Sequence, residues 1–357
     1  MASHDRLLWG IAPAALAGML ALGAADAVAG DYKQIKQSAQ SAGIAELRMT
    51  EAGGLSGDSI EKGYLDPFTE NSGVRVVREN PSGLGKLRAM VEGGNVTSVL
   101  LELSSPELEQ AKALDLVEPL DWEAIAPEPM FEEARDEKGY GYQYYTTLMA
   151  WREDAKAPQS WQDFWNVEEF PGKRALPDYP SYILPMALLA DGVPVEELYP
   201  LDLDRAFASL EKIKDHVAVW WQAGAQAPQL LQDNEVQYAV AWSGRVAGQE
   251  GIDYTYEDGQ LDIAFFVVPK GAPAEAIEVA NGILYEMSVP ENQAVAADVV
   301  SYTGNSPELE PLLPKDRIEE FPTVAANKDV QFLSDATWWF ENAEEVETRW
   351  QEFKLGL

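Results

Sequence analysis

The sequence predicts an α/β protein of two lobes, each with helices on the faces of a sheet. Strands and helices alternate over residues 44–113, a pattern typical of a parallel sheet. Two short apolar runs, 238–242 and 263–268, are each bounded by a turn, as buried strands are. The chain also has 357 residues, of which 46% are hydrophobic, enough for two domains with their own cores.

The composition excludes several kinds of chemistry. The chain has no cysteine, so disulfides, thiolate metal sites, cysteine nucleophiles and a lipid-modified N-terminal cysteine are excluded. Its two histidines are His4 and His216, too few for the usual histidine-based triads and metal sites. We therefore expect no bound metal and no cofactor.

The chain is strongly acidic, with a formal net charge of −34. Nucleic acids and anionic membrane surfaces both require a positive protein face, so neither is expected as a partner. The acidity fits a hydrated carboxylate surface in a salty habitat, where salt screens the repulsion. A cationic ligand is the alternative explanation.

Residues 1–29 have the pattern of a secretory signal peptide. Arg6 precedes an apolar run over 7–22, and Ala-Val-Ala at 27–29 offers a cleavage site. The alternative is an N-terminal membrane anchor, which the shortness of the run disfavours. No later stretch is apolar enough to span a bilayer, so we expect an exported, soluble mature protein.

The first lobe is expected to begin at residue 44. We predict a strand that ends at Glu51, an amphipathic segment over 60–71 that Gly73 ends, a strand over 74–77, a helix over 84–92, a strand over 96–103 and a helix over 106–113 capped by Ser105. Ligands of such sheets bind beyond the carboxyl ends of the strands. That rule selects the stretches 51–54, 82–83 and 102–105, with Gly53, Ser82 and Glu102 as the candidate binding residues.

The second lobe is expected to follow an aromatic, β-prone run over 139–149. We then predict a helix from Trp161 capped by Ser160, a strand over 174–176, helices over 182–190 and 204–215, a strand over 217–221, and helices over 228–233, 274–287, 291–300 and from Asp335.

Four aromatic or acidic side chains in this half are further candidates for ligand contact. Alternation along the run 139–149 places Tyr140, Tyr142 and Tyr144 on one face and Tyr145 on the other. The candidates are Tyr145, Asp178 and Tyr179 in the loop after the strand 174–176, and Trp221. A role in the core is the alternative for each.

Trp242 and Arg245 lie where the apolar run 238–242 ends, separated by Ser243 and Gly244. A flat aromatic ring and a fixed cation on a loop after a strand are suited to ligand binding. A core tryptophan and a solvated arginine are the alternative.

The order of several motifs resembles one family. The runs PQSWQDFW, FPGKRAL, AWSGR, FVVPKGAP, PENQA and YTGNSPEL are similar to those of bacterial extracellular solute-binding proteins of the spermidine/putrescine-binding type, from about Met49 to the C-terminus. These proteins are periplasmic receptors of ABC importers. The resemblance implies a hinged, two-lobe periplasmic-binding-protein fold of type II, with the ligand in the cleft between the lobes.

By analogy, the chain crosses between the lobes three times, near 144–148, 262–266 and 303–305. The implied lobes consist of residues 44–146 with 264–304, and of residues 147–263 with 305–357. The resemblance further implies a monomer whose ligand-closed form delivers its solute to the membrane subunits of an ABC permease.

Polyamine-binding members join aromatic walls to carboxylates that pair with ammonium groups. Carried over by position, Trp242 matches the pocket tryptophan, Phe265 or Phe266 the aromatic before Val-Pro-Lys-Gly, and Tyr302 the C-terminal pocket tyrosine, while Asp262 lies near a family acid. Arg245 departs from the pattern, since some putrescine receptors carry aspartate there. A cation at this position would favour a solute with a carboxylate.

We therefore predict the substrate-binding component of an ABC transporter, which captures a small, amine-containing, polyamine-like solute. One alternative is a receptor for a carboxylate-bearing solute such as an amino acid, γ-aminobutyrate or an opine, and another is a sensory binding protein. An enzyme is not expected, because the sequence has neither a G-x-S-x-G elbow nor a phosphate-cradling glycine loop followed by lysine.

Overall fold

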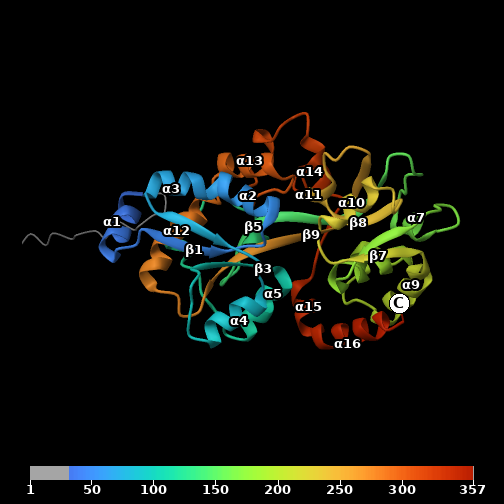
Figure 1. Cartoon of the computed structure of the whole chain (residues 1–357), viewed down its shortest axis with the longest axis horizontal. Coiled ribbons are helices and arrows are strands. Elements are labelled where there is room, and N and C mark those ends of the chain that lie inside the picture. Colours follow the sequence, from blue (N-terminus) through green and yellow to red (C-terminus); the bar gives the residue numbers. More distant parts are fainter. Residues whose placement is uncertain (1–31, 357) are drawn as a thin grey trace, which may run out of the picture.

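A single mixed sheet organises the computed structural model, which describes residues 32–356 (Figure 1). The described part has ten strands: β1 Glu46–Thr50, β2 Arg75–Glu79, β3 Leu100–Ser104, β4 Val117–Glu118, β5 Tyr140–Arg152, β6 Arg174–Pro177, β7 Val217–Trp221, β8 Tyr238–Trp242, β9 Ile252–Pro269 and β10 Phe332–Leu333. Their main order is β2-β1-β3-β9-β5-β8-β6-β7.

The long strands β5 and β9 join two groups of shorter strands. They run antiparallel, from the pair Tyr140–Phe266 to the pair Arg152–Ile252. The parallel strands β1, β2 and β3 continue the sheet on the β9 side, and β8, β6 and β7 continue it on the β5 side. Figure 1 shows these groups at opposite ends of the molecule. The predicted two-lobe α/β fold is confirmed, whereas the predicted lobe boundaries stay a prediction.

Helices cover both faces of this sheet. Those of the described residues are α1 Tyr32–Ala42, α2 Gly54–Ile60, α3 Asp66–Ser72, α4 Leu84–Glu92, α5 Ser105–Ala113, α6 Trp122–Ile125, α7 Trp161–Trp165, α8 Leu184–Ala190, α9 Leu203–Ile213, α10 Gln226–Gln232, α11 Ser243–Val246, α12 Ala274–Glu286, α13 Pro290–Val299, α14 Ala325–Lys328, α15 Ala336–Glu341 and α16 Ala343–Lys354. None of them is long and apolar enough to cross a membrane. The predicted signal peptide lies outside the described residues.

Local signals account for several helix ends. Gly73 ends α3 in the left-handed conformation at φ 77°, and the Ser160 side chain accepts a hydrogen bond from the Asp163 amide at the start of α7, both as predicted. The predicted cap Ser105 is wrong by one residue. Ser104 caps α5, because Ser104 and Glu107 form a capping box there.

Each strand group has its own apolar core. One core packs α1, α3 and α12 against β1 and β9, with Phe68, Phe266 and Ile283 fully buried. The other packs α8, α9 and α16 against β5 and β8, with Trp161 and Leu210 at its centre. Such burial is the dominant favourable term in folding.

The strand β5 departs from simple alternation. A register shift between Gly141 and Gln143 leaves Tyr142 as an extra residue, a β-bulge. The expectation that Tyr144 shares a face with Tyr140 and Tyr142 is therefore wrong: Tyr144 packs in a separate apolar cluster. The bulge instead places Gln143 and Tyr145 on the same face as Tyr140, beside Ala264 and Asp262 of β9.

A buried carboxylate anchors the C-terminal helix α16. Lys354 Nζ lies 2.9 Å from both Asp178 oxygens, and Trp350 Nε1 donates to Asp178 Oδ1 at 3.1 Å. The Asp178 side chain is only 8% exposed. These contacts tie α16 to the loop after β6.

We expect Asp178→Asn to lower the free energy of unfolding by roughly 2 kcal/mol, because a charge-assisted pair is lost in a mostly buried place. The control Asp154→Asn removes a surface pair, since the Asp154 side chain is 71% exposed, and should cost under about 0.5 kcal/mol. Urea unfolding measures both. Equal losses in the two variants would contradict the anchoring role of Asp178.

Candidate ligand-binding site

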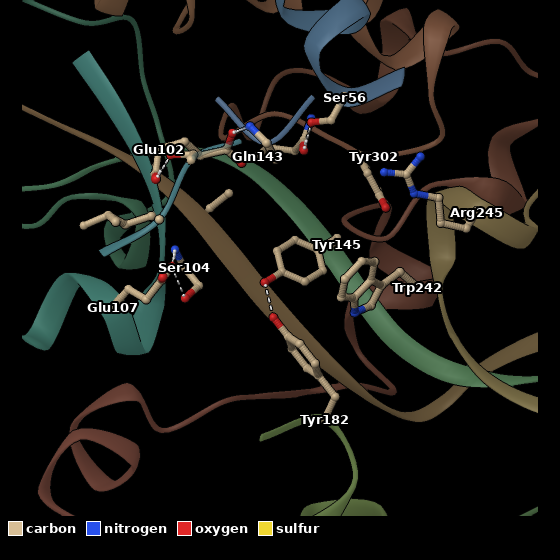
Figure 2. Close-up of a pocket in the computed structure, with 15 residues that line it drawn as sticks. Ser56, Glu102, Ser104, Glu107, Gln143, Tyr145, Tyr182, Trp242, Arg245 and Tyr302 are labelled. Atoms are coloured by element: carbon tan, nitrogen blue, oxygen red, sulfur yellow. Dashed lines mark hydrogen bonds between the residues drawn. The ribbon is translucent and has the colours of Figure 1, made fainter. Parts of the chain in front are cut away.

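A cavity of about 210 Å³ lies where the two strand groups meet (Figure 2). Its walls come from the ends of β1, β3 and β8, from the middle of β5 and from the segment that follows α13. The lining residues are Ala52, Ser56, Ser82, Gly83, Glu102, Leu103, Ser104, Glu107, Gln143, Tyr145, Tyr182, Trp242, Arg245, Ala264 and Tyr302. We call this the central cavity.

Four aromatic side chains form one side of the central cavity. Tyr145 meets Trp242 with ring centroids 6.2 Å apart at 76°, and Tyr182 meets Trp242 at 5.6 Å and 83°. Tyr302 meets Tyr145 at 6.1 Å. Edge-to-face contacts of this kind stabilise the rings in fixed orientations. The wall is therefore largely formed before a ligand arrives.

Two glycines let the aromatic side chains approach the backbone this closely. A Cβ atom on Gly224 would lie 2.5 Å from Trp242 Cε3, and one on Gly244 would lie 2.5 Å from Tyr302 Cε1. Any larger residue would displace a ring of the cavity wall.

Arg245 lies in the wall, on the one-turn helix α11, with its guanidinium beside the Tyr302 hydroxyl (Figure 2). It is the sole cationic side chain among the lining residues. Its Nε is buried without a hydrogen-bond partner, and no carboxylate of residues 32–356 forms an ion pair with it. An arginine left in this state is ready to bind an anionic group.

Carboxylates lie at the other end of the cavity, where Figure 2 shows Glu102 and Glu107 away from Arg245. Glu102 is 8% exposed and accepts a hydrogen bond from the Ala52 amide at 2.7 Å. Burial raises the pKa of Glu102 to about 7, although the bond from Ala52 opposes the rise. Glu107 is held by amides of Ser104 and Leu84 at 3.0 Å. The cavity is thus polar at both ends with opposite charges.

Six of the predicted site residues line the central cavity: Ser82, Glu102, Tyr145, Trp242, Arg245 and Tyr302. Their side chains come together from five separate parts of the chain, and Ser82, Glu102 and Trp242 do so from strand ends, as expected of ligand sites in such sheets.

The other six predicted residues do not line it. Gly53 directs its amide to Glu51, and Asp178 anchors α16. Trp221 is fully buried and supports Trp242 from behind, with rings 5.1 Å apart. Phe266 packs in the core against Tyr142, with ring centroids 4.5 Å apart. Tyr179 and Asp262 line a neighbouring cavity.

Four polar residues of the central cavity were missed from sequence: Ser56, Glu107, Gln143 and Tyr182. Tyr182 was expected to begin an apolar helix, but it lies in a 3-10 turn over Pro180–Tyr182. Gln143 reaches the cavity through the bulge in β5 and accepts a hydrogen bond from Ser56 Oγ at 3.0 Å. Among residues 32–356, no group of three or more His, Asp or Glu side chains is placed to hold a metal ion.

We expect the buried Glu102 carboxyl to make stability depend on pH. Its pKa rises from the ordinary 4.5 when unfolded to about 7 when folded, so its stabilising contribution is lost as pH rises through this window. As pH rises from about 4.5 to 7, the unchanged protein should lose free energy of unfolding that the Glu102→Gln variant keeps, so the variant becomes relatively more stable. Thermal unfolding of both proteins across this range measures the difference, and a constant difference would contradict the burial argument.

Comparison with known proteins identifies the family of this chain. Residues 63–348 match the family described as bacterial extracellular solute-binding protein. A γ-aminobutyric acid-binding protein of Pseudomonas aeruginosa is 35% identical over 316 residues, which are 85% of this chain and 89% of that protein.

Solved structures have the same fold. An ABC transporter substrate-binding protein from Bradyrhizobium japonicum has a TM-score of 0.81 at 33% identity, covering 87% of this chain and 99% of that one. An Agrobacterium tumefaciens binding protein in complex with agropinic acid has a TM-score of 0.75 at 30% identity, covering 87% and 98%.

The spermidine/putrescine type is a more distant neighbour. The structure of such a protein from Streptococcus pneumoniae has a TM-score of 0.70 at 19% identity, covering 86% of this chain and 99% of that one, a likeness of fold alone. The polyamine subtype is therefore not confirmed. The chain belongs to the bacterial extracellular solute-binding protein family and is the substrate-binding component of an ABC transporter.

Proposed function

We propose that this protein captures a small zwitterion of the γ-aminobutyrate class, with its carboxylate and its ammonium at opposite ends, and delivers it to an ABC permease. The observation that supports this most is Arg245, a cation without a carboxylate partner in the wall of an aromatic cavity. A solute that brings its own carboxylate supplies the missing partner.

The carboxylate of the solute would bind the Arg245 guanidinium. Its planar donor groups match a carboxylate in a bidentate geometry, and charge-assisted hydrogen bonds are stronger than neutral ones. The Tyr302 hydroxyl, beside the guanidinium in Figure 2, is a further polar group at this end.

The ammonium end would lie between aromatic rings and toward Glu102. The faces of tryptophan and tyrosine attract cations, and Trp242, Tyr145 and Tyr182 surround the middle of the cavity. The methylenes of the solute would pack on the same rings. A nearby ammonium also favours the charged form of the buried Glu102 carboxyl.

The size of the cavity suits a small solute, and its charge favours this class over a bare polyamine. A volume of about 210 Å³ lies below the range of sites for drug-sized ligands, which begins near roughly 300 Å³. A diamine would place an ammonium close to the like charge of Arg245. The γ-aminobutyric acid and agropinic acid named for two relatives both include an acid group.

Capture would proceed by closure of the lobes around the cavity. We place the crossings within β5, within β9 and near Thr303, which pairs with Tyr144 in an isolated bridge. A few residues there would absorb the rotation, and the closed form would be recognised by the permease in the periplasm.

We expect γ-aminobutyrate to raise the melting temperature of the mature protein, whereas putrescine and spermidine do not. A ligand at about 100 times its dissociation constant adds roughly 2.7 kcal/mol, which gives a shift of several degrees. A panel of amines, amino acids, betaines and dicarboxylates in a thermal shift assay measures this. A shift with bare polyamines alone would contradict the proposal.

We expect Arg245→Asp to weaken γ-aminobutyrate binding by roughly 30-fold or more, because removing one partner of a buried charge pair costs about 2 kcal/mol or more. The same change should move the preference toward diamines, since two ends of the cavity would then be acidic. Calorimetry measures both. The control Arg88→Gln removes an exposed pair with Glu92 and should leave binding unchanged. An unaltered ranking of ligands would overturn the role of Arg245.

A further inference from the structure

A second cavity adjoins the central cavity on the far side of Tyr182. Its volume is about 390 Å³, and it shares Ser104, Glu107 and Tyr182 with the central cavity. Its remaining walls are the helix α5, the loop that carries Tyr179, the strand β9, the segment before α15, and the helices α15 and α16. Because α15 packs against α5, this second cavity also lies where the two strand groups meet.

The second cavity has the chemistry of a cation site. Glu107, Asp262 and Glu347 all line it, and none of its lining residues is a lysine or arginine. Trp339 adds an aromatic wall. An acidic cavity with aromatic sides suits an alkylammonium group.

Asp262 is the feature that distinguishes this cavity from an ordinary acidic surface. The residue is 4% exposed, and its Oδ2 accepts a hydrogen bond from Gln260 Nε2 at 2.9 Å. No cation of residues 32–356 pairs with its carboxylate, and burial raises the pKa of Asp262 to about 7. A buried carboxylate that faces a cavity in this way lacks the cationic partner that such groups normally have.

Two tyrosine hydroxyls separate the second cavity from the central one. Tyr145 and Tyr182 form a hydrogen bond of 3.0 Å between their hydroxyl groups, which Figure 2 shows meeting below the central cavity. Tyr145 is also the ladder partner of Asp262 on β9. Tyr182 lines both cavities, and Tyr145 lines the central cavity beside Asp262, so the pair lies between the two cavities.

We propose that the Tyr145–Tyr182 pair sets the length of the solute by closing the central cavity against the acidic second cavity. This inference rests on the proposed function, in which Arg245 holds the carboxylate. A short zwitterion then fits within the central cavity, with its ammonium among the rings of Trp242, Tyr145 and Tyr182. A longer one needs the pair to open, after which its ammonium reaches Asp262.

Binding of γ-aminobutyrate, 5-aminovalerate and 6-aminohexanoate, measured by calorimetry, tests this inference. The unchanged protein should bind more weakly as the chain lengthens. Tyr182→Ala joins the cavities and should shift the affinity ratio of 6-aminohexanoate to γ-aminobutyrate at least tenfold toward the longer solute. Tyr182→Phe keeps the ring and removes the hydrogen bond, so its shift should be smaller but in the same direction.

Two further variants make the test specific. Tyr238→Phe, the control, removes a tyrosine hydroxyl that donates to the Lys156 carbonyl at 3.0 Å away from both cavities, and should leave the ratio unchanged. Asp262→Asn should alter γ-aminobutyrate binding by less than about twofold in the unchanged background. Combined with Tyr182→Ala, it should abolish the gain for 6-aminohexanoate.

Two results would overturn the inference while leaving the proposed function in place. One is an unchanged ratio in both Tyr182 variants. The other is a loss of γ-aminobutyrate affinity of tenfold or more in Asp262→Asn alone, which would mean that the short solute already reaches Asp262. Failure of the unchanged protein to bind any of the three solutes would overturn the proposed function and this inference together.

Discussion

The antiparallel pairing of β5 and β9 is the constraint on which the rest of the structure depends. Each strand is long enough to take part in both strand groups, so one pair of strands belongs to two cores at once. Side chains from the middle of this pair face the place where the groups meet. Tyr145 and Ala264 line the central cavity, and Asp262 lines the second one. The position of the binding site thus follows from the topology of the sheet.

The net charge of the molecule does not determine the charge of the binding site. A chain with a formal net charge of −34 places an arginine without an ion-pair partner in its central cavity. A negative surface repels anions at long range, although salt screens this repulsion over about 10 Å at 0.1 M. A zwitterion has no net charge, so the surface neither attracts nor repels it strongly. Selectivity therefore depends on groups within the cavity.

Much of the fold could be predicted because its signals are local. Gly73 and Ser160 mark helix ends through their own conformations and hydrogen bonds, and the apolar run before Trp242 became β8. The length of β9 could not be predicted, since residues 252–262 are polar in part and form a strand through pairing with distant β5. Tyr182 and Phe266 show that a residue's place in the site, too, can depend on contacts with distant parts of the chain. Their orientations depend on a turn and on a core that local sequence does not specify.

The bulge in β5 means that this strand has one residue more than its pairing with β9 requires. Tyr142 has no partner on β9, whereas Gln143 and Tyr145 lie opposite Ala264 and Asp262. Loss of Tyr142 would therefore restore regular pairing and leave Gln143 and Tyr145 on the same face as before, at the cost of the contact between Tyr142 and Phe266. In a lineage of such receptors, a single-codon deletion at this point would therefore keep the side chains that face the cavity. Substitutions, by contrast, would alter the cavity one side chain at a time.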